Sequence, residues 1–149
     1  MKRHVAVLHG PNLNLLGTRE PDIYGTTTLA DIDAALVERA KARGFTVETF
    51  QSNHEGALVD RLHELAARAG AIVINPGAYT HTSVAIADAL RAIAVPAIEC
   101  HLSHLARREP FRRKSLVGPS CVGVVSGFGW RSYIYALDAA LDLVETAPR

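Results

Sequence analysis

Short apolar runs recur along the chain and predict the strands of a β-sheet. Residues 5–8 and residues 71–74 are continuous apolar runs, and the second has the composition of a central parallel strand. Residues 45–49 alternate with polar side chains, which indicates a strand with one less buried face. Residues 96–100 begin at a proline, where the missing N–H does least harm, and residues 122–125 complete the predicted set.

The segments between these strands carry apolar residues at helical spacing. Thr28 with Asp31 resembles a capping box, and Ser83 is a candidate N-cap. Gly44 and Gly70 supply helix stops. The apolar stripes of the predicted helices are Leu29, Ile32, Leu36 and Ala40; Leu58, Leu62, Leu65 and Ala69; Val84, Ala87, Leu90 and Ala94; and Ile134, Leu137, Leu141 and Val144.

Strands that alternate with helices predict an α/β fold, a three-layer sandwich around a five-stranded parallel sheet. For one domain of 149 residues we expect the flavodoxin-like strand order 2-1-3-4-5. The last helix also carries Trp130, Tyr133 and Tyr135, which point in directions too different to lie on one buried stripe. This predicts a subunit contact. A partly exposed aromatic pair is the alternative.

The connection after the first strand, residues 11–25, is longer than a compact α/β unit needs. It carries two asparagines, an Arg-Glu pair, and Tyr24 beside Gly25. We interpret residues 12–25 or so as a lid over a binding site; a surface Ω-loop is the alternative.

Composition narrows the function classes. The net charge of +1 gives no electrostatic case for a nucleic acid or a membrane surface as partner. No apolar window approaches the roughly 20 residues of a membrane helix, and the first apolar run is too short for a signal peptide. Cys100 and Cys121 lie in apolar runs without a CxxC pair, which predicts buried free thiols and a cytoplasmic location.

Polar side chains gather where the predicted strands end. In a doubly wound sheet, ligands bind beyond the carboxyl ends of the strands. Those ends carry His9 and Asn12 after the first strand, Asn75 and then His81 after the third, and residues 99–103 at the fourth. Glycines at the same edge let a substrate approach the backbone. The sequence therefore predicts a small-molecule site at this edge.

Glu99 and His101 lie two residues apart on a strand and so point to the same face. A carboxylate beside an imidazole fixes its tautomer and raises its basicity, which suits a general acid. A structural ion pair is the alternative, and His9 or His81 taken alone could be a capping or core histidine. The seven histidines lack the spacing of a metal site.

Basic side chains cluster at residues 107–114. Arg108 and Arg112 would share a face if this stretch were helical. Next to a crevice they would hold a small carboxylate or phosphate, although a solvated surface patch is the usual explanation. Arg19 near Tyr24 would favour the tyrosinate and lower the pKa of that phenol, which makes Tyr24 a candidate base.

Four motifs together resemble those of the type II 3-dehydroquinate dehydratase family. They are LHGPNLNLLGTREPDIYG at residues 8–25, QSNHEG at residues 51–56, INPGAYTHTS at residues 74–83, and E-x-HLS followed by REPFR within residues 99–112. The resemblance implies a flavodoxin-like fold and a trans elimination of water from 3-dehydroquinate through an enolate. It places the enzyme in the shikimate pathway of aromatic amino acid biosynthesis. It also implies no cofactor, no metal, no Schiff-base lysine, and a homododecamer built as a tetramer of trimers.

By matching position, the resemblance also assigns catalytic roles. Tyr24 resembles the base that removes the C2 proton, and Arg19 the group that activates it and stabilises the transition state. Asn12 would help hold a water at the enolate oxygen. His101, oriented by Glu99, resembles the acid that protonates the departing hydroxyl.

The residues that the resemblance assigns to substrate binding are Asn75, His81, Leu102, Ser103, Arg112 and, from a neighbouring subunit, Asp88. The chain departs from the common family pattern at His104 and at residues 117–120, neither of which has a named catalytic role. Two rival functions remain: a non-catalytic module for small anions, and a lyase that forms an enolate from another polyhydroxy carboxylate.

Overall fold

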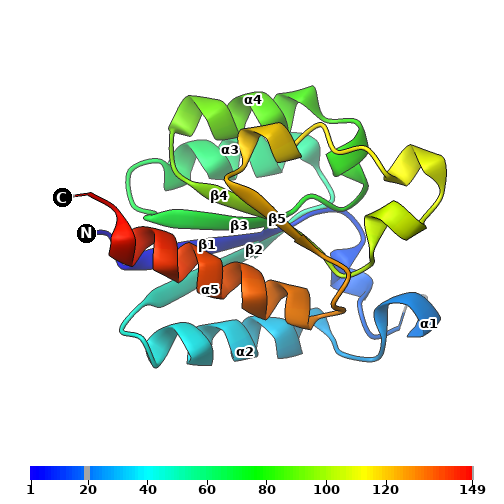
Figure 1. Ribbon diagram of the computed structural model, residues 1–149, viewed down its shortest axis with the longest axis horizontal. Helices are drawn as coiled ribbons and strands as arrows, with labels where there is room; N and C mark the ends of the chain where they lie inside the picture. The colour runs from blue at the N-terminus through cyan, green and yellow to red at the C-terminus, as the bar shows by residue number, and fades with distance from the viewer. Residues whose placement is uncertain (19–20, 149) are drawn as a thin grey trace.

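A five-stranded parallel sheet forms the centre of the molecule (Figure 1). The computed structural model describes residues 1–18 and 21–148, with the side chains of residues 23 and 24 left outside the description. The strand order is β2-β1-β3-β4-β5, the flavodoxin-like order expected for one α/β domain of this length. The strands are β1 (His4–His9), β2 (Thr46–Gln51), β3 (Ala71–Asn75), β4 (Ala97–His101) and β5 (Gly123–Ser126).

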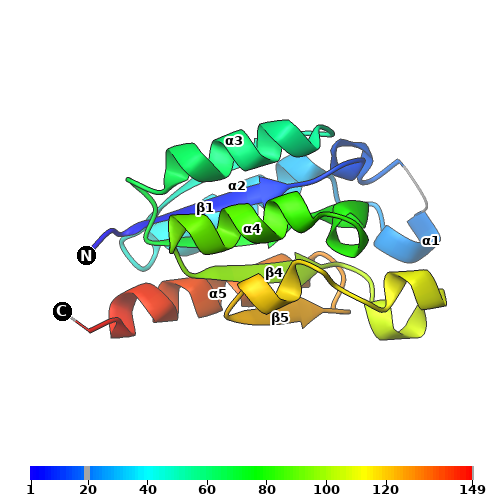
Figure 2. The same ribbon diagram turned by 90° about the horizontal axis from the view of Figure 1, so that it is seen from above.

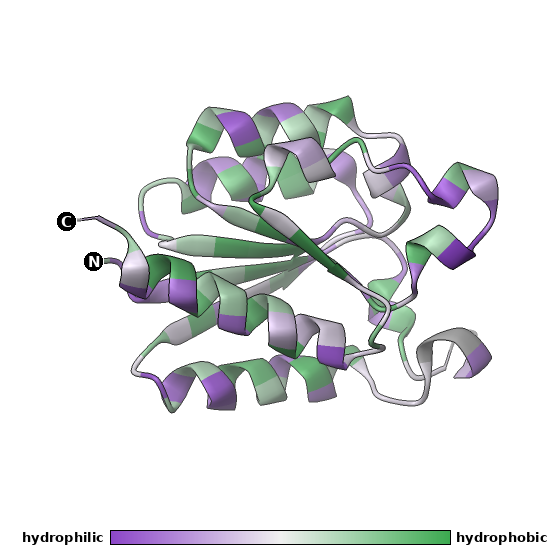
Figure 3. Ribbon diagram, viewed as in Figure 1, coloured by the Kyte–Doolittle hydropathy of each residue, from purple (hydrophilic) through white to green (hydrophobic). Residues whose placement is uncertain are grey.

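Two helices cover each face of the sheet, which confirms the three-layer prediction (Figure 1). On one face, α2 (Leu29–Lys41) and α5 (Arg131–Thr146) pack on Val5, Val7 and Val73. On the other, α3 (Glu55–Leu65) and α4 (Val84–Ile93) pack on the alternate strand residues. Figure 3 shows the strands as largely apolar and the outer helix surfaces as polar.

The predicted helix starts are confirmed. Thr28 and Asp31 form a complete capping box at α2, and the hydroxyl of Ser83 accepts a hydrogen bond from the backbone N–H of Ile86 at α4. The predicted extent of α3 was wrong, because its helix ends at Leu65 and not beside Gly70. The N–H of Arg68 bonds back only three residues, to the carbonyl of Leu65, so the chain tightens into a turn there.

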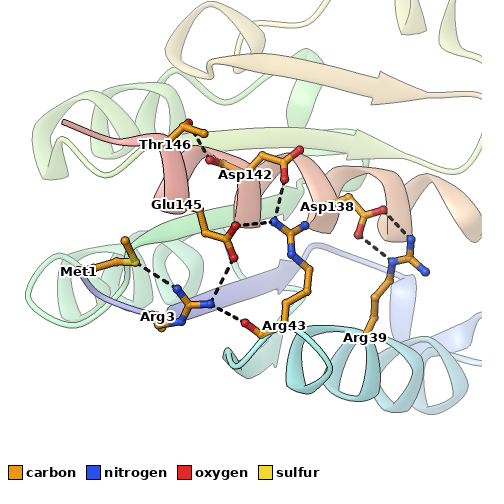
Figure 4. Close-up of polar contacts among 8 residues, drawn as sticks. All are labelled: Met1, Arg3, Arg39, Arg43, Asp138, Asp142, Glu145 and Thr146. Atoms are coloured by element: carbon orange, nitrogen blue, oxygen red, sulfur yellow. Dashed lines mark hydrogen bonds and ion pairs between the residues drawn. The ribbon is translucent and has the colours of Figure 1, made fainter. Parts of the chain in front are cut away.

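Helices α2 and α5 are also joined by a ladder of charged side chains (Figure 4). Arg39 contacts both carboxylate oxygens of Asp138 at 2.7 Å, and Arg43 contacts Asp142 at 2.8 Å. Glu145 at the end of α5 binds both Arg43 and Arg3. Because each pair is exposed, each one adds little stability, but together they fix how the two helices face each other.

Short connecting helices gather at the carboxyl edge of the sheet (Figure 2). The connection over residues 11–25 contains η1 (Leu13–Leu15) and α1 (Pro21–Tyr24). After β3 comes η2 (Gly77–His81), and after β4 come η3 (Leu105–Arg107) and η4 (Pro110–Arg112). A further turn, η5 (Gly118–Ser120), precedes β5.

Two predictions about individual side chains were wrong. Tyr133 is fully buried and binds His9, so it is no part of a subunit contact, whereas Tyr135 is 45% exposed. Cys121 lies at the end of η5 outside any strand and is only half-buried, while Cys100 is fully buried in β4 as predicted. No helix in the described part of the chain is long and apolar enough to cross a membrane.

Candidate active site

Strand register aligns polar residues along the carboxyl edge. His9 of β1 stands opposite Gln51 on one side and Asn75 on the other. His101 of β4 stands opposite Ser126 of β5. The fourth strand includes His101, one residue beyond its predicted end, so Glu99 and His101 belong to one rigid element and share a face.

Glu99 and His101 form a buried acid–base pair. The imidazole Nε2 lies 2.5 Å from Oε2 of Glu99, which is 0% exposed, while His101 is 5% exposed. A carboxylate only accepts hydrogen bonds, so Nε2 carries the proton. Nδ1 is then the ring nitrogen left to exchange a proton with a bound molecule.

Two hydroxyl groups that the sequence did not single out complete the coordination of Glu99. Thr80 of η2 donates to Oε2 and Ser115 donates to Oε1, each at 2.7 Å. Burial alone would raise the pKa of the Glu99 carboxyl, but the hydrogen bonds from His101, Thr80 and Ser115 outweigh it and hold that pKa below its usual value. Glu99 therefore stays ionised at neutral pH.

A pocket of about 110 Å³ opens beside this pair. Seven of the predicted site residues line it: Asn12, Asn75, His81, His101, Leu102, Ser103 and Arg112. Two larger hollows, of about 670 and 570 Å³, lie near the chain termini and between α2 and α5. Neither contains the Glu99–His101 pair, so the smaller pocket is the candidate active site.

The pocket floor depends on close contact between the loops that follow β1 and β3. A Cβ at Gly10 would lie 2.4 Å from the carbonyl oxygen of Pro76, so only glycine fits there. Asn12 takes a left-handed conformation (φ 70°), and its N–H donates to the side chain of Asn53 at 3.0 Å. These contacts bring Asn12 to the rim beside Asn75.

His81 and Asn75 are held by backbone groups. Nδ1 of His81 lies 2.8 Å from the carbonyl oxygen of Lys114. Since a carbonyl only accepts, Nδ1 is the protonated nitrogen and Nε2 of the neutral ring is an acceptor. The side-chain oxygen of Asn75 accepts from the N–H of Gly77 at 3.1 Å, which leaves its amide group to donate.

Arginines supply positive charge to the pocket, but the stretch that carries them is not one continuous helix, so Arg108 and Arg112 do not share a helical face. Arg108 is extended and Arg112 closes the short η4, because Pro110 interrupts any continuous helix. Both side chains still line the pocket. Arg108 donates to the hydroxyl of Ser103 at 3.2 Å, and Arg112 to Glu109 at 2.7 Å. The basic segment had indicated Arg108 together with Arg112 as arginines that could hold a small anion, although the family resemblance assigned substrate binding only to Arg112.

A second buried network lies behind Asn75. His9 is fully buried, with Nε2 2.8 Å from Asp33 and Nδ1 2.7 Å from the hydroxyl of Tyr133. Burial raises the pKa of the Tyr133 phenol well above its usual value, against the effect of its hydrogen bond with Asn75. The phenol is therefore a proton donor to His9, which answers the open question about that histidine: it is a core residue.

Three predicted site residues are not brought to the pocket by the described contacts. Arg19 and the side chain of Tyr24 lie outside the described residues. Asp88 is exposed on α4 and pairs with Arg91 of the same helix. No group of three or more His, Cys, Asp or Glu side chains within the described ranges is placed to hold a metal ion.

The fold and the pocket define a doubly wound α/β protein whose acid–base pair stands beside arginines, as suits a small anionic substrate. A family model described as dehydroquinase class II matches residues 3–141. The chain belongs to this family.

Solved structures and curated relatives agree with this membership. The chain is 64% identical over 143 residues to 3-dehydroquinate dehydratase of Ralstonia pickettii, covering 94% of this chain and 91% of the relative. It is 57% identical to the Rhizobium meliloti protein of the same name, covering 97% and 98%. The type II dehydroquinase of Butyrivibrio crossotus superposes with a TM-score of 0.90 at 43% identity, covering 92% of this chain and 96% of that one.

Proposed function

We propose that this chain is a lyase that removes water from 3-dehydroquinate to give 3-dehydroshikimate, a step of the shikimate pathway toward aromatic amino acids. The relatives that bear the name 3-dehydroquinate dehydratase support the reaction. The observation that carries the assignment to this site is the buried Glu99–His101 pair beside a pocket lined by Arg108 and Arg112. The elimination proceeds through an enolate.

His101 is proposed as the acid. Its Nε2 proton is held by Glu99, so the imidazolium form has one transferable proton, at Nδ1. Delivery to the C1 hydroxyl turns a poor leaving group into water.

Tyr24 is proposed as the base that removes the C2 proton, with Arg19 lowering the pKa of its phenol and stabilising the transition state. Asn12, at the pocket rim, helps to hold a water against the enolate oxygen. We further propose that residues 12–25 act as a lid, because both Arg19 and Tyr24 lie in this long connection. Closure then brings the base to the substrate and excludes bulk water.

Substrate binding is proposed for the polar lining. Arg112 and Ser103 hold the carboxylate, while Asn75, His81 and the backbone at Leu102 hold the hydroxyl groups. Asp88 reaches the site of a neighbouring subunit, which accounts for its exposed place on α4 and requires an assembly, proposed as a dodecamer of four trimers. The two free thiols support a reducing, cytoplasmic setting.

The direct test is to incubate the purified chain with 3-dehydroquinate and follow the ultraviolet absorbance of the conjugated enone. We expect turnover without added metal or cofactor and no substrate adduct after borohydride treatment. Tyr24→Phe should lower kcat by at least 100-fold, since it removes the proton acceptor. Full activity of Tyr24→Phe would overturn the assigned base. Turnover of another polyhydroxy carboxylate in preference to 3-dehydroquinate would overturn the substrate.

A further inference from the structure

We propose that Thr80 and Ser115 are positioning residues of the reaction: they hold the Glu99 carboxylate ionised and aimed at His101. The inference rests on the proposed role of His101 as the acid. Neither the Thr80 hydroxyl nor the Ser115 hydroxyl lines the pocket. They act on the substrate only through Glu99 and His101.

The carboxylate of Glu99 is held from three separate segments. Nε2 of His101 on the same strand and the Thr80 hydroxyl from η2 both donate to Oε2. The Ser115 hydroxyl, from the loop before η5, donates to Oε1. Each carboxylate oxygen therefore has a hydroxyl donor besides the histidine: Thr80 for Oε2 and Ser115 for Oε1. The carboxyl plane cannot rotate without breaking one of these hydrogen bonds of 2.7 Å.

The two donors are themselves held in place. The N–H of Gly118 donates to the Ser115 hydroxyl at 2.8 Å, which directs the Ser115 proton toward Glu99. The N–H of Leu116 donates to the carbonyl oxygen of Thr80 at 2.7 Å and joins the two donor segments. A Cβ at Gly118 would lie 3.1 Å from Oε1 of Glu99, so the backbone at Gly118 packs closely against this carboxylate.

Burial gives these hydrogen bonds their importance. Glu99 is 0% exposed, and a buried carboxylate takes up a proton unless donors compensate for the lost water. Among the described residues, the other titratable groups that interact with Glu99 are His101 and two thiols. Burial raises the pKa of Cys121 to about 12 and that of Cys100 further, so both thiols stay neutral over the working range. Ionisation at this position therefore belongs to the Glu99–His101 pair.

An ionised Glu99 determines which nitrogen of His101 can act. While the carboxylate accepts from Nε2, the proton that leaves must come from Nδ1. If Glu99 became neutral, it could donate to the ring instead, and Nε2 of His101 would lose the acceptor that fixes its orientation. Thr80 and Ser115 are therefore predicted to affect proton donation without affecting substrate binding.

The test uses the full-length enzyme with Ser115→Ala and Thr80→Val, and Ser120→Ala as the matched control. Ser120 is a half-buried serine of the same segment, and its hydroxyl accepts a hydrogen bond from Arg91, whereas the hydroxyls of Thr80 and Ser115 donate to Glu99. The first measurement needs no substrate: carbon-13 NMR follows the Glu99 carboxyl against pH, with its signal assigned by loss in Glu99→Gln. The second measures kcat and KM against pH for 3-dehydroquinate.

We expect each variant to raise the pH at which Glu99 titrates by about one unit and to lower kcat roughly tenfold, with KM changed less than twofold. Ser120→Ala should match the parent chain, and Ser115→Thr and Thr80→Ser should restore both readouts because they restore the hydroxyl.

An unchanged Glu99 titration in both Ser115→Ala and Thr80→Val would overturn the inference. Equal loss of kcat in Ser115→Ala and Ser115→Thr would also overturn it, because packing and not the hydroxyl would then matter. If Thr80→Val does not fold, the half-buried Ser115 still decides the question. Failure of the proposed function looks different: the Glu99 titration shifts as expected, while the parent chain does not dehydrate 3-dehydroquinate.

Discussion

Replacing Tyr133 with phenylalanine removes one oxygen atom from the centre of the molecule. Tyr133 and His9 are both fully buried, their ring centroids lie 5.1 Å apart, and the hydroxyl lies 2.7 Å from Nδ1 of His9. The phenylalanine ring fills nearly the same space, so the change creates no sizeable cavity. It leaves Nδ1 of His9 as a buried acceptor without a donor.

The expected loss follows from that unpaired nitrogen. A buried polar atom that loses its hydrogen-bond partner costs about 1–3 kcal/mol. For a chain of this size, each kcal/mol lowers Tm by about 2–4 °C.

Urea unfolding of Tyr133→Phe at fixed protein concentration measures the loss, with the m-value as a check that the unfolding transition is otherwise unchanged. Tyr135→Phe is the matched control, because Tyr135 lies on the same helix with 45% of its surface exposed. We expect the control to change stability by less than about 0.5 kcal/mol. Equal losses in the two variants would refute the argument that His9 depends on Tyr133.

Two further variants test charged groups. Glu48 accepts from Arg68 and His4; these contacts outweigh burial and lower the pKa of its carboxyl from 4.5 to about 2. Because the pKa of Glu48 is lowered in the folded chain, this stabilisation is full above pH 4.5 and is lost as the pH falls toward 2. In Glu48→Gln the unfolding free energy should therefore fall less steeply with acid over that range. Glu38→Gln, at an exposed position, is the control and should keep the slope of the parent chain. Arg112→Ala should raise KM for 3-dehydroquinate roughly 10- to 100-fold with a smaller change in kcat. Arg107 lies outside the pocket lining, so Arg107→Ala is the control and should leave KM unchanged. An unchanged KM in Arg112→Ala would contradict a contact between Arg112 and the substrate carboxylate.

The architecture was predictable from the sequence because apolar runs and helical stripes report burial directly. The runs at residues 5–8 and 71–74 lie in β1 and β3, at the centre of the sheet. Once the strands were placed, the rule that ligands bind at strand ends brought Asn12, Asn75 and His101 to one edge, where they line the pocket. The same rule also included His9, which is a buried core residue. Glu99 and His101 followed from strand alternation alone.

Contacts between distant segments were not predictable in this way. Ser115 is 16 residues from Glu99, and Tyr133 is 124 residues from His9. Single serines and tyrosines carry no local pattern that indicates their partners, and the aromatic side chain of Tyr133 was assigned to a surface for that reason. Pro110, between Arg108 and Arg112, was by contrast a visible signal that these two arginines would not lie on one continuous helix.

The central claim is that His101 supplies the proton for the departing hydroxyl at this pocket. The most direct measurement compares two rates for His101→Ala: exchange of the C2 proton of 3-dehydroquinate with deuterated solvent, and formation of the enone. Because the base is a different residue, we predict that exchange continues while dehydration falls by about 100- to 10,000-fold. Loss of both rates to the same extent, or dehydration at the parent rate, would contradict the account.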